Sequence, residues 1–234
     1  LIASAREYTR AAYLRPMAMP GSASAIREPW RMGISFLEAA LGDGWRDLPL
    51  PLVQGLNDRQ IEVAVKMILS GLNSPLTSSM GRLFDAVAAI LGLHLKVAFE
   101  GQAAMALEHL ASDDSTNPYP FAWENGDAKV IDTSTIIQGV VDDVLAGVPP
   151  ERVAARFHET LIHGLTDLCG ALRRETGLRQ VALSGGVFQN VRLLEGLLKR
   201  LKAAGFTVYA HRRVPTNDGG LSLGQAVAAA AITD

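Results

Sequence analysis

The chain has 234 residues, of which 48% are hydrophobic and 20% are charged. This composition allows a sizeable core in one large or two small domains and excludes a disordered protein. The formal net charge of −2 provides no bulk attraction to nucleic acid or to an anionic membrane. One cysteine excludes an internal disulfide, and neither a membrane span nor a signal peptide is recognisable, so we expect a soluble, cytoplasmic protein.

The N-terminal third predicts a loop followed by helices. Proline and glycine favour a loop over residues 14–24, after which a helix opens at Ala25 or Glu28 and runs to about residue 41. The stretch 42–56 is polar and proline-rich, which predicts a surface connection. A second helix is predicted over residues 58–69, where a glycine ends it.

The next helix is predicted within residues 76–93, and its apolar face carries a carboxylate, Asp85. Its hydroxyl-rich start could either cap the helix or hold an anion. A carboxylate beside a core face costs free energy unless it has a partner, such as Arg82 or a ligand hydroxyl. Glu100 and Gly101 begin another helix over residues 100–111, where a carboxylate often only compensates the helix dipole.

The middle of the chain predicts a hairpin and two helices. An Asn-Gly pair lies between the apolar runs 119–123 and 128–131, which is typical of a hairpin. A helix follows to Leu145, and the longest helix is predicted over residues 150–175. None of the five histidines has the spacing of a metal-ligating pair, so we interpret them as ordinary residues.

Residues 180–225 predict strand, glycine turn, helix, strand, glycine turn and helix in succession. Such turns place backbone N–H groups at one edge of an α/β sheet, where phosphates and nucleotides bind. Tight connections without any ligand are an equally good interpretation of the glycines alone. The second turn also carries Asp218, which could cap the last helix or ligate a metal. The candidate residues of the two turns are Ser184, Gly185, Gly186, Asn190, Asn217 and Asp218.

Several motifs occur in an order typical of one family. SSMGRLFDA, FEGQAAM, SGGVFQN and VPTNDGGLSLGQA, together with LRPMAMPG and AIREPWRM near the start, resemble the hydrogenase-maturation carbamoyltransferase (HypF) family. The last domain of that family is similar to the tRNA threonylcarbamoyl-transferase (TsaD/Kae) proteins. The chain departs from the family at Gly21-Ser22-Ala23, where Gly-Gly-Asp is usual. Nearby, Arg27 and Trp30 could contact a ligand, although packing of Trp30 under the loop is the favoured interpretation.

The resemblance implies an α/β lobe of the actin-like ATPase fold, shared with sugar kinases and Hsp70 and similar to RNase H, in an incomplete two-lobe domain. Residues 1–75 would form an N-terminal loop and helical segment, and residues 76–234 the second lobe. It also implies the ligands. Asp85 would contact the adenosine ribose, and the other implied nucleotide-binding residues are Glu100, Gly101, Ser184, Gly185, Gly186 and Asn190. Asp218 would be one ligand of a divalent metal (iron, zinc or magnesium) whose other ligands, including an HxxxH motif, this sequence lacks.

The implied activity is that of part of a carbamoyltransferase. The family forms carbamoyl-adenylate from ATP and carbamoyl phosphate, and transfers the carbamoyl group to the C-terminal cysteine of HypE during synthesis of the cyanide ligands of nickel–iron hydrogenase. We expect HypE, adenine nucleotide and upstream domains of a longer polypeptide as partners, and weak nucleotide binding without transfer by these residues alone. The alternatives are a threonylcarbamoyl transferase, another actin-like ATPase, or a non-catalytic docking lobe. The hypothesis places both glycine turns, Asp85 and Glu100 around one cleft.

Overall fold

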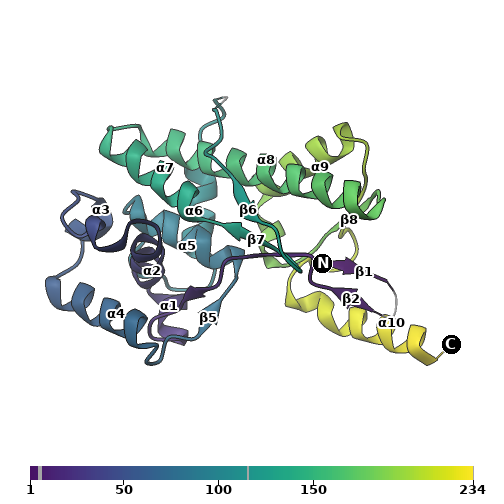
Figure 1. Cartoon of the computed structure of the whole chain (residues 1–234), viewed down its shortest axis with the longest axis horizontal. Coiled ribbons are helices and arrows are strands. Elements are labelled where there is room, and N and C mark those ends of the chain that lie inside the picture. Colours follow the sequence, from purple (N-terminus) through teal and green to yellow (C-terminus); the bar gives the residue numbers. More distant parts are fainter. Residues whose placement is uncertain (5–6, 115, 234) are drawn as a thin grey trace. The chain divides into compact units, whose positions relative to one another are not determined.

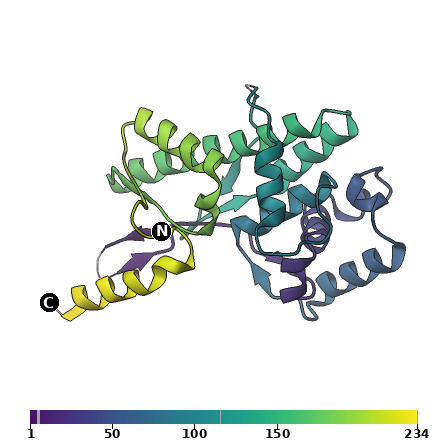
Figure 2. The ribbon, with the colours of Figure 1, turned by 180° about the vertical axis from the view of Figure 1, so that it is seen from behind.

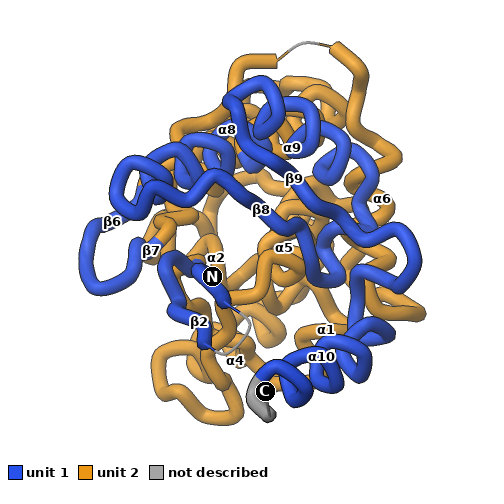
Figure 3. Tube along the Cα trace, turned by 90° about the vertical axis from the view of Figure 1, so that its right-hand side faces the viewer, with its two compact units in different colours: residues 1–13, 123–130, 161–234 blue, residues 14–122, 131–160 orange. Residues whose placement is uncertain are grey.

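The protein is described here by a computed structural model, which covers residues 1–4, 7–114 and 116–233. The chain forms two compact units, which Figure 3 shows in different colours. Unit 1 consists of residues 1–13, 123–130 and 161–234, and unit 2 of residues 14–122 and 131–160. The chain passes between the units within β3 (Ala12–Leu14), β6 (Ala122–Glu124), β7 (Lys129–Asp132) and α8 (Pro150–Thr176). The division into an N-terminal segment, residues 1–75, and a second lobe, residues 76–234, describes lobes of an actin-like domain and not these two units. It stays a prediction.

Unit 2 is mainly helical. Its elements in chain order are β4 (Met17–Ala18), α1 (Ala23–Arg27), α2 (Trp30–Leu41), the 3-10 helix η1 (Gly42–Trp45), α3 (Pro51–Gln54), α4 (Asp58–Ser70), β5 (Leu76–Thr77), α5 (Met80–Ile90), α6 (Gln102–Leu110) and α7 (Ser134–Leu145). The predicted helices over residues 58–69, 100–111 and 150–175 are confirmed, with small shifts of their ends. The helix predicted within residues 76–93 begins only at Met80, after β5, and the one predicted up to residue 41 is divided into α1 and α2.

Helices α2 and α5 form the centre of unit 2 and lie side by side in Figure 1. Residues 82–90 of α5 are all buried, so this helix is surrounded by protein. Gly33 of α2 makes room for Leu52 of α3, because a Cβ there would lie 2.6 Å from Leu52 Cδ2, whereas its 3.4 Å distance from Ala89 Cβ of α5 would be an ordinary contact. The packing of this core holds the start of α5, and with it Asp85, in a defined position.

Two predictions for the N-terminal third are wrong. Residues 14–24 are not all loop, because β4 pairs antiparallel with β5, Met17 opposite Thr77. The prolines flank this short strand and do not interrupt its hydrogen bonds. Residues 42–56 are not a surface connection, because Trp45, Leu50 and Leu52 are 0% exposed. Their polar neighbours are mostly exposed, so the average polarity of the segment concealed its apolar anchors.

Unit 1 contains the predicted C-terminal pattern. Its elements are β1 (Ile2–Ala3), β2 (Tyr8–Thr9), β8 (Gln180–Leu183), the 3-10 helix η2 (Gly186–Gln189), α9 (Val191–Ala203), β9 (Thr207–Ala210), the 3-10 helix η3 (Asp218–Gly220) and α10 (Leu221–Thr233). Strands β8 and β9 are parallel, with Gln180 opposite Thr207 and Leu183 opposite Ala210. The succession of strand, turn and helix is confirmed, except that η2 separates the first turn from α9.

Helix α9 connects β8 to β9 and packs against the C-terminal part of α8. A side chain at Gly196 of α9 would collide with Ile162 of α8, and Figures 1 and 2 both show the two helices side by side. Since β8 and β9 are parallel, their carboxyl ends lie at one edge. The first glycine turn follows β8 directly, whereas the second begins at Asp218, after a connection that leaves β9 at Ala210. No helix within the described residues is both long and apolar enough to cross a membrane.

Candidate functional site

The site residues predicted in unit 2 are brought together at the start of α5. Arg82 Nη1 and Asp85 Oδ2, one helical turn apart, are separated by 3.0 Å, and their side chains are 9% and 4% exposed. The two groups form an ion pair but are not aligned for a hydrogen bond, since neither of these two buried atoms has a hydrogen-bond partner in the described structure. Arg82 is therefore confirmed as the partner expected for Asp85, but Asp85 Oδ2 can still accept a hydrogen bond that no described group donates.

The electrostatics of Asp85 follow from its burial. Removal from water raises the pKa of its carboxyl group from 3.8 to about 6, although the Arg82 guanidinium opposes this rise and Glu100 adds to it. Glu100 Oε1 lies 3.7 Å from Arg82 Nη2, and the Glu100 side chain is 75% exposed. The arrangement is one buried carboxylate, one buried guanidinium and a second, solvated carboxylate at its rim.

Gly101 immediately precedes α6 and adopts a φ of 86°, which favours glycine. No atom lies within 4 Å of the position a Cβ would occupy, so the backbone conformation, and not crowding by protein, accounts for glycine there. Gln102 Oε1 accepts a hydrogen bond of 2.7 Å from the Ala98 backbone N–H, which fastens the segment before the helix. We had not predicted this contact; the short spacing from Ala98 to Gln102 was its only sequence signal.

The two glycine turns of unit 1 lie against each other. The Gly185 N–H donates to the Thr216 carbonyl at 2.9 Å, and Thr216 Oγ1 donates to the Gly185 carbonyl at 3.1 Å. Ser184 Oγ is 2.9 Å from His211 Nε2. Sequence reasoning missed Thr216 and His211, but His211 follows the residue paired with Leu183, so strand pairing was a usable signal.

Two of the polar turn residues act as helix caps. Asn190 is 8% exposed, and its side-chain oxygen accepts a 2.8 Å hydrogen bond from the Leu193 N–H at the start of α9. Asn217 accepts from the Gly219 N–H at 3.1 Å, so Asn217, and not Asp218, caps the second turn. This leaves the exposed Asp218 carboxylate outside the capping hydrogen bonds.

The residues present do not by themselves fit a metal ion. Over residues 1–4, 7–114 and 116–233, no three or more His, Cys, Asp or Glu side chains are arranged to hold one. Asp218 supplies a single exposed carboxylate, whereas divalent cations need several ligands. We therefore derive no catalytic step from a metal. The expectation that the Asp85 group and the two turns share a cleft involves both units and stays a prediction.

Comparison with known proteins places the chain in a family. Residues 1–225 match the profile described as "Carbamoyltransferase, Kae1-like Domain, second subdomain". The chain belongs to the HypF family. It is 38% identical to carbamoyltransferase HypF of Rhodobacter capsulatus over 99% of its own length, and 35% identical to HypF2 of Cupriavidus necator over 92%. It covers 29% of each of these HypF proteins.

Solved HypF structures agree with the fold. Full-length HypF in a phosphate- and nucleotide-bound form matches with a TM-score of 0.93 at 37% identity, over 99% of this chain and 30% of that one. HypF of T. kodakarensis matches with a TM-score of 0.80 at 23% identity, over 95% of this chain and 30% of that one. The predicted α/β, actin-like fold class and the predicted membership of the HypF family are confirmed.

Proposed function

We propose that this part of a HypF protein binds the adenosine portion of carbamoyl-adenylate during carbamoyl transfer to the C-terminal cysteine of HypE. Membership of the HypF family supports the reaction class. The observation that carries the proposal is the buried Oδ2 of Asp85, which lacks a hydrogen bond. A ribose hydroxyl that donates to this atom would supply the missing partner, and leaving it unsatisfied costs about 1–3 kcal/mol.

In the proposed reaction the thiolate of HypE attacks the carbamoyl carbon of the mixed anhydride. A carbon–sulfur bond forms, the bond from that carbon to the phosphate oxygen breaks, and AMP leaves with the electron pair. The residues of this chain would hold the leaving group and orient the anhydride, which lowers the entropic part of the barrier. In this proposal Asp85 holds the ribose, while the backbone at Gly101 and at Gly185 and Gly186 approaches the nucleotide closely.

The first test is a calorimetric titration of the protein with adenosine. We expect Asp85→Asn to weaken binding by about tenfold or more, because a hydrogen bond to a charged group contributes about 1.5–3 kcal/mol. Asp47→Asn removes an equal charge at an exposed position outside the site and serves as the matched control. Equal adenosine affinity in all three proteins would contradict the assignment of Asp85.

Asn190 needs a different substitution because it also caps α9. Asn190→Asp keeps the oxygen that accepts from Leu193 and removes the amide N–H donor, so α9 should remain capped. We expect lower adenosine affinity with an unchanged midpoint of thermal unfolding. Unchanged affinity in both the Asn190 and the Asp85 variants would show that the family's nucleotide-binding residues do not transfer to this chain.

The complete reaction needs the rest of the HypF polypeptide in this proposal, since the chain spans 29% of the length of HypF from Rhodobacter capsulatus and of HypF2 from Cupriavidus necator. We expect these 234 residues to transfer no carbamoyl group to HypE on their own. Carbamoylation of HypE should be followed by mass spectrometry, with carbamoyl phosphate and ATP supplied. Transfer at the rate of a full-length HypF would refute the division of labour proposed here.

A further inference from the structure

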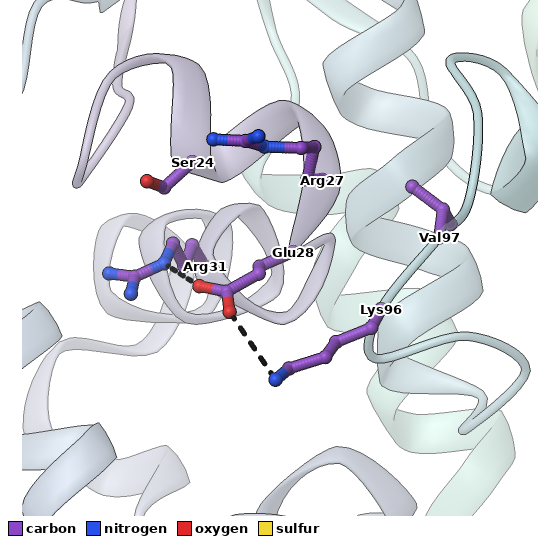
Figure 4. A pocket seen from close by; sticks show the side chains of 6 residues that line it. All are labelled: Ser24, Arg27, Glu28, Arg31, Lys96 and Val97. Atoms are coloured by element: carbon purple, nitrogen blue, oxygen red, sulfur yellow. Dashed lines mark hydrogen bonds and ion pairs between the residues drawn. The ribbon is translucent and has the colours of Figure 1, made fainter.

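A cavity in unit 2, with a volume of about 390 Å³, lies outside the Asp85 group (Figure 4). Its walls come from α1, the start of α2 and the segment before α6. The lining residues are Ser24, Arg27, Glu28, Arg31, Lys96 and Val97. Cavities of about 300 Å³ or more accommodate small molecules. None of these residues belongs to the nucleotide-binding set proposed above.

The two walls are fastened to each other. The Val97 N–H donates to the Arg27 carbonyl at 3.0 Å, which links the segment before α6 to the end of α1. Glu28 strengthens this link, because its Oε1 lies 3.7 Å from Lys96 Nζ, and its Oε2 accepts a 2.6 Å hydrogen bond from Arg31 Nε. One carboxylate therefore positions a basic group on each wall.

The Trp30 ring also restrains the Arg31 side chain. Its guanidinium carbon lies 4.4 Å from the centre of the Trp30 ring, and Trp30 is only 3% exposed. Because Glu28 engages Nε, the terminal nitrogens remain for another partner. Figure 4 shows that these nitrogens and the Arg27 guanidinium extend toward the side of the cavity where Ser24 lies. The side chain is thus oriented before any ligand binds, which reduces the entropy lost on binding.

The charge of the cavity is unbalanced. Three basic side chains and one carboxylate line it, a formal excess of two positive charges. Within the described part of the chain, the Arg27 side chain makes no ion pair or hydrogen bond. The protein as a whole has a net charge of −2, so this concentration of positive charge is local. It matches a compact anion that carries two charges and several acceptor oxygens.

We propose that this cavity binds the phosphate group of a small phosphorylated ligand. Guanidinium groups form paired, charge-assisted hydrogen bonds with phosphate oxygens. Arg27 and Arg31 would supply these bonds, Lys96 would add charge, and the Ser24 hydroxyl would donate to a further oxygen. A phosphate dianion neutralises the excess charge, which a single carboxylate would not. This site goes beyond the proposed adenosine site, because it uses other side chains.

The proposal is tested by calorimetric titration of the protein with inorganic phosphate and with ribose 5-phosphate, at constant ionic strength and with acetate as the comparison anion. We expect phosphate to bind and the double variant R27Q/K96Q to lose about tenfold or more in affinity, because the charge-assisted hydrogen bonds of Arg27 and the positive charge of Lys96 disappear. The control R59Q/K202Q removes the same charge from exposed positions elsewhere and should bind phosphate like the unaltered protein.

The same titrations separate this site from the adenosine site. R27Q/K96Q should bind adenosine normally, and Asp85→Asn should bind phosphate normally. Tighter binding of ribose 5-phosphate than of inorganic phosphate supports a phosphorylated small molecule as the ligand. Equal phosphate affinity in R27Q/K96Q and the unaltered protein, or no preference for phosphate over acetate, would each overturn the proposal.

Discussion

At the scale of single residues, Asp85 couples the candidate site to the pH dependence of stability. Its pKa of about 6 lies above the ordinary value of 3.8, so the folded protein retains a proton that the unfolded chain releases first. The stabilising contribution is therefore complete below the unfolded pKa and is lost as the pH rises through about 6, a change of about 3 kcal/mol. Denaturant unfolding over this pH range should show the decline, and Asp85→Asn should lack it. Parallel stability curves for the two proteins would contradict the burial of the charge.

A second residue, Ser22, is held in a backbone conformation that suits glycine. Its φ is 53° and its ψ −117°, and its side chain makes no capping hydrogen bond. Such strain costs about 1–3 kcal/mol in a residue with a Cβ. We expect Ser22→Gly to raise the free energy of unfolding by about 1 kcal/mol after the entropy gained by the unfolded chain is deducted. Ser22→Ala keeps the Cβ and should give no gain; an equal gain in both variants would show that backbone strain is not the cause.

At the scale of elements, α9 and α10 differ in what their apolar residues do. Leu197 of α9 is 1% exposed, whereas Leu223 of α10 is 52% exposed. We expect Leu197→Ala to lower the free energy of unfolding by about 2–5 kcal/mol, because it leaves a cavity against a packed helix. Leu223→Ala should change it by less than about 0.5 kcal/mol. Chemical denaturation compares the two directly, and similar losses would mean that α10 is packed in solution.

At the scale of the whole molecule, charge discriminates between related functions. The chain also resembles tRNA N6-adenosine threonylcarbamoyltransferase of Thermotoga neapolitana, at 28% identity over 68% of its length. With a net charge of −2, it has no bulk electrostatic attraction for RNA. We expect no tRNA binding in a mobility-shift assay at physiological salt. Salt-dependent tRNA binding would favour the threonylcarbamoyl-transferase alternative.

Local sequence signals predicted much of the fold and some of the contacts in the candidate site. Helical periodicity and glycine located the C-terminal strands and helices, and a buried carboxylate one turn from an arginine predicted the Arg82 and Asp85 pair. These features depend on neighbours within a few residues. The buried anchors within residues 42–56 were not predicted, because other helices cover them: α2 contacts η1, and α5 contacts α3.

Sequence alone determined the order of the C-terminal strands and helices, the family and the residue types available for binding. Only the tertiary structure decided that Thr216 joins the Gly185 turn, that Asn217 caps where Asp218 could have, and that Arg27 and Lys96 line one cavity. The Thr216 contact and the cavity bring together residues far apart in the chain, so their geometry depends on how whole elements pack. The Asn217 cap is local and depends on the backbone conformation of the turn. Periodicity reports which side of an element is apolar, but it does not report which other element covers that side.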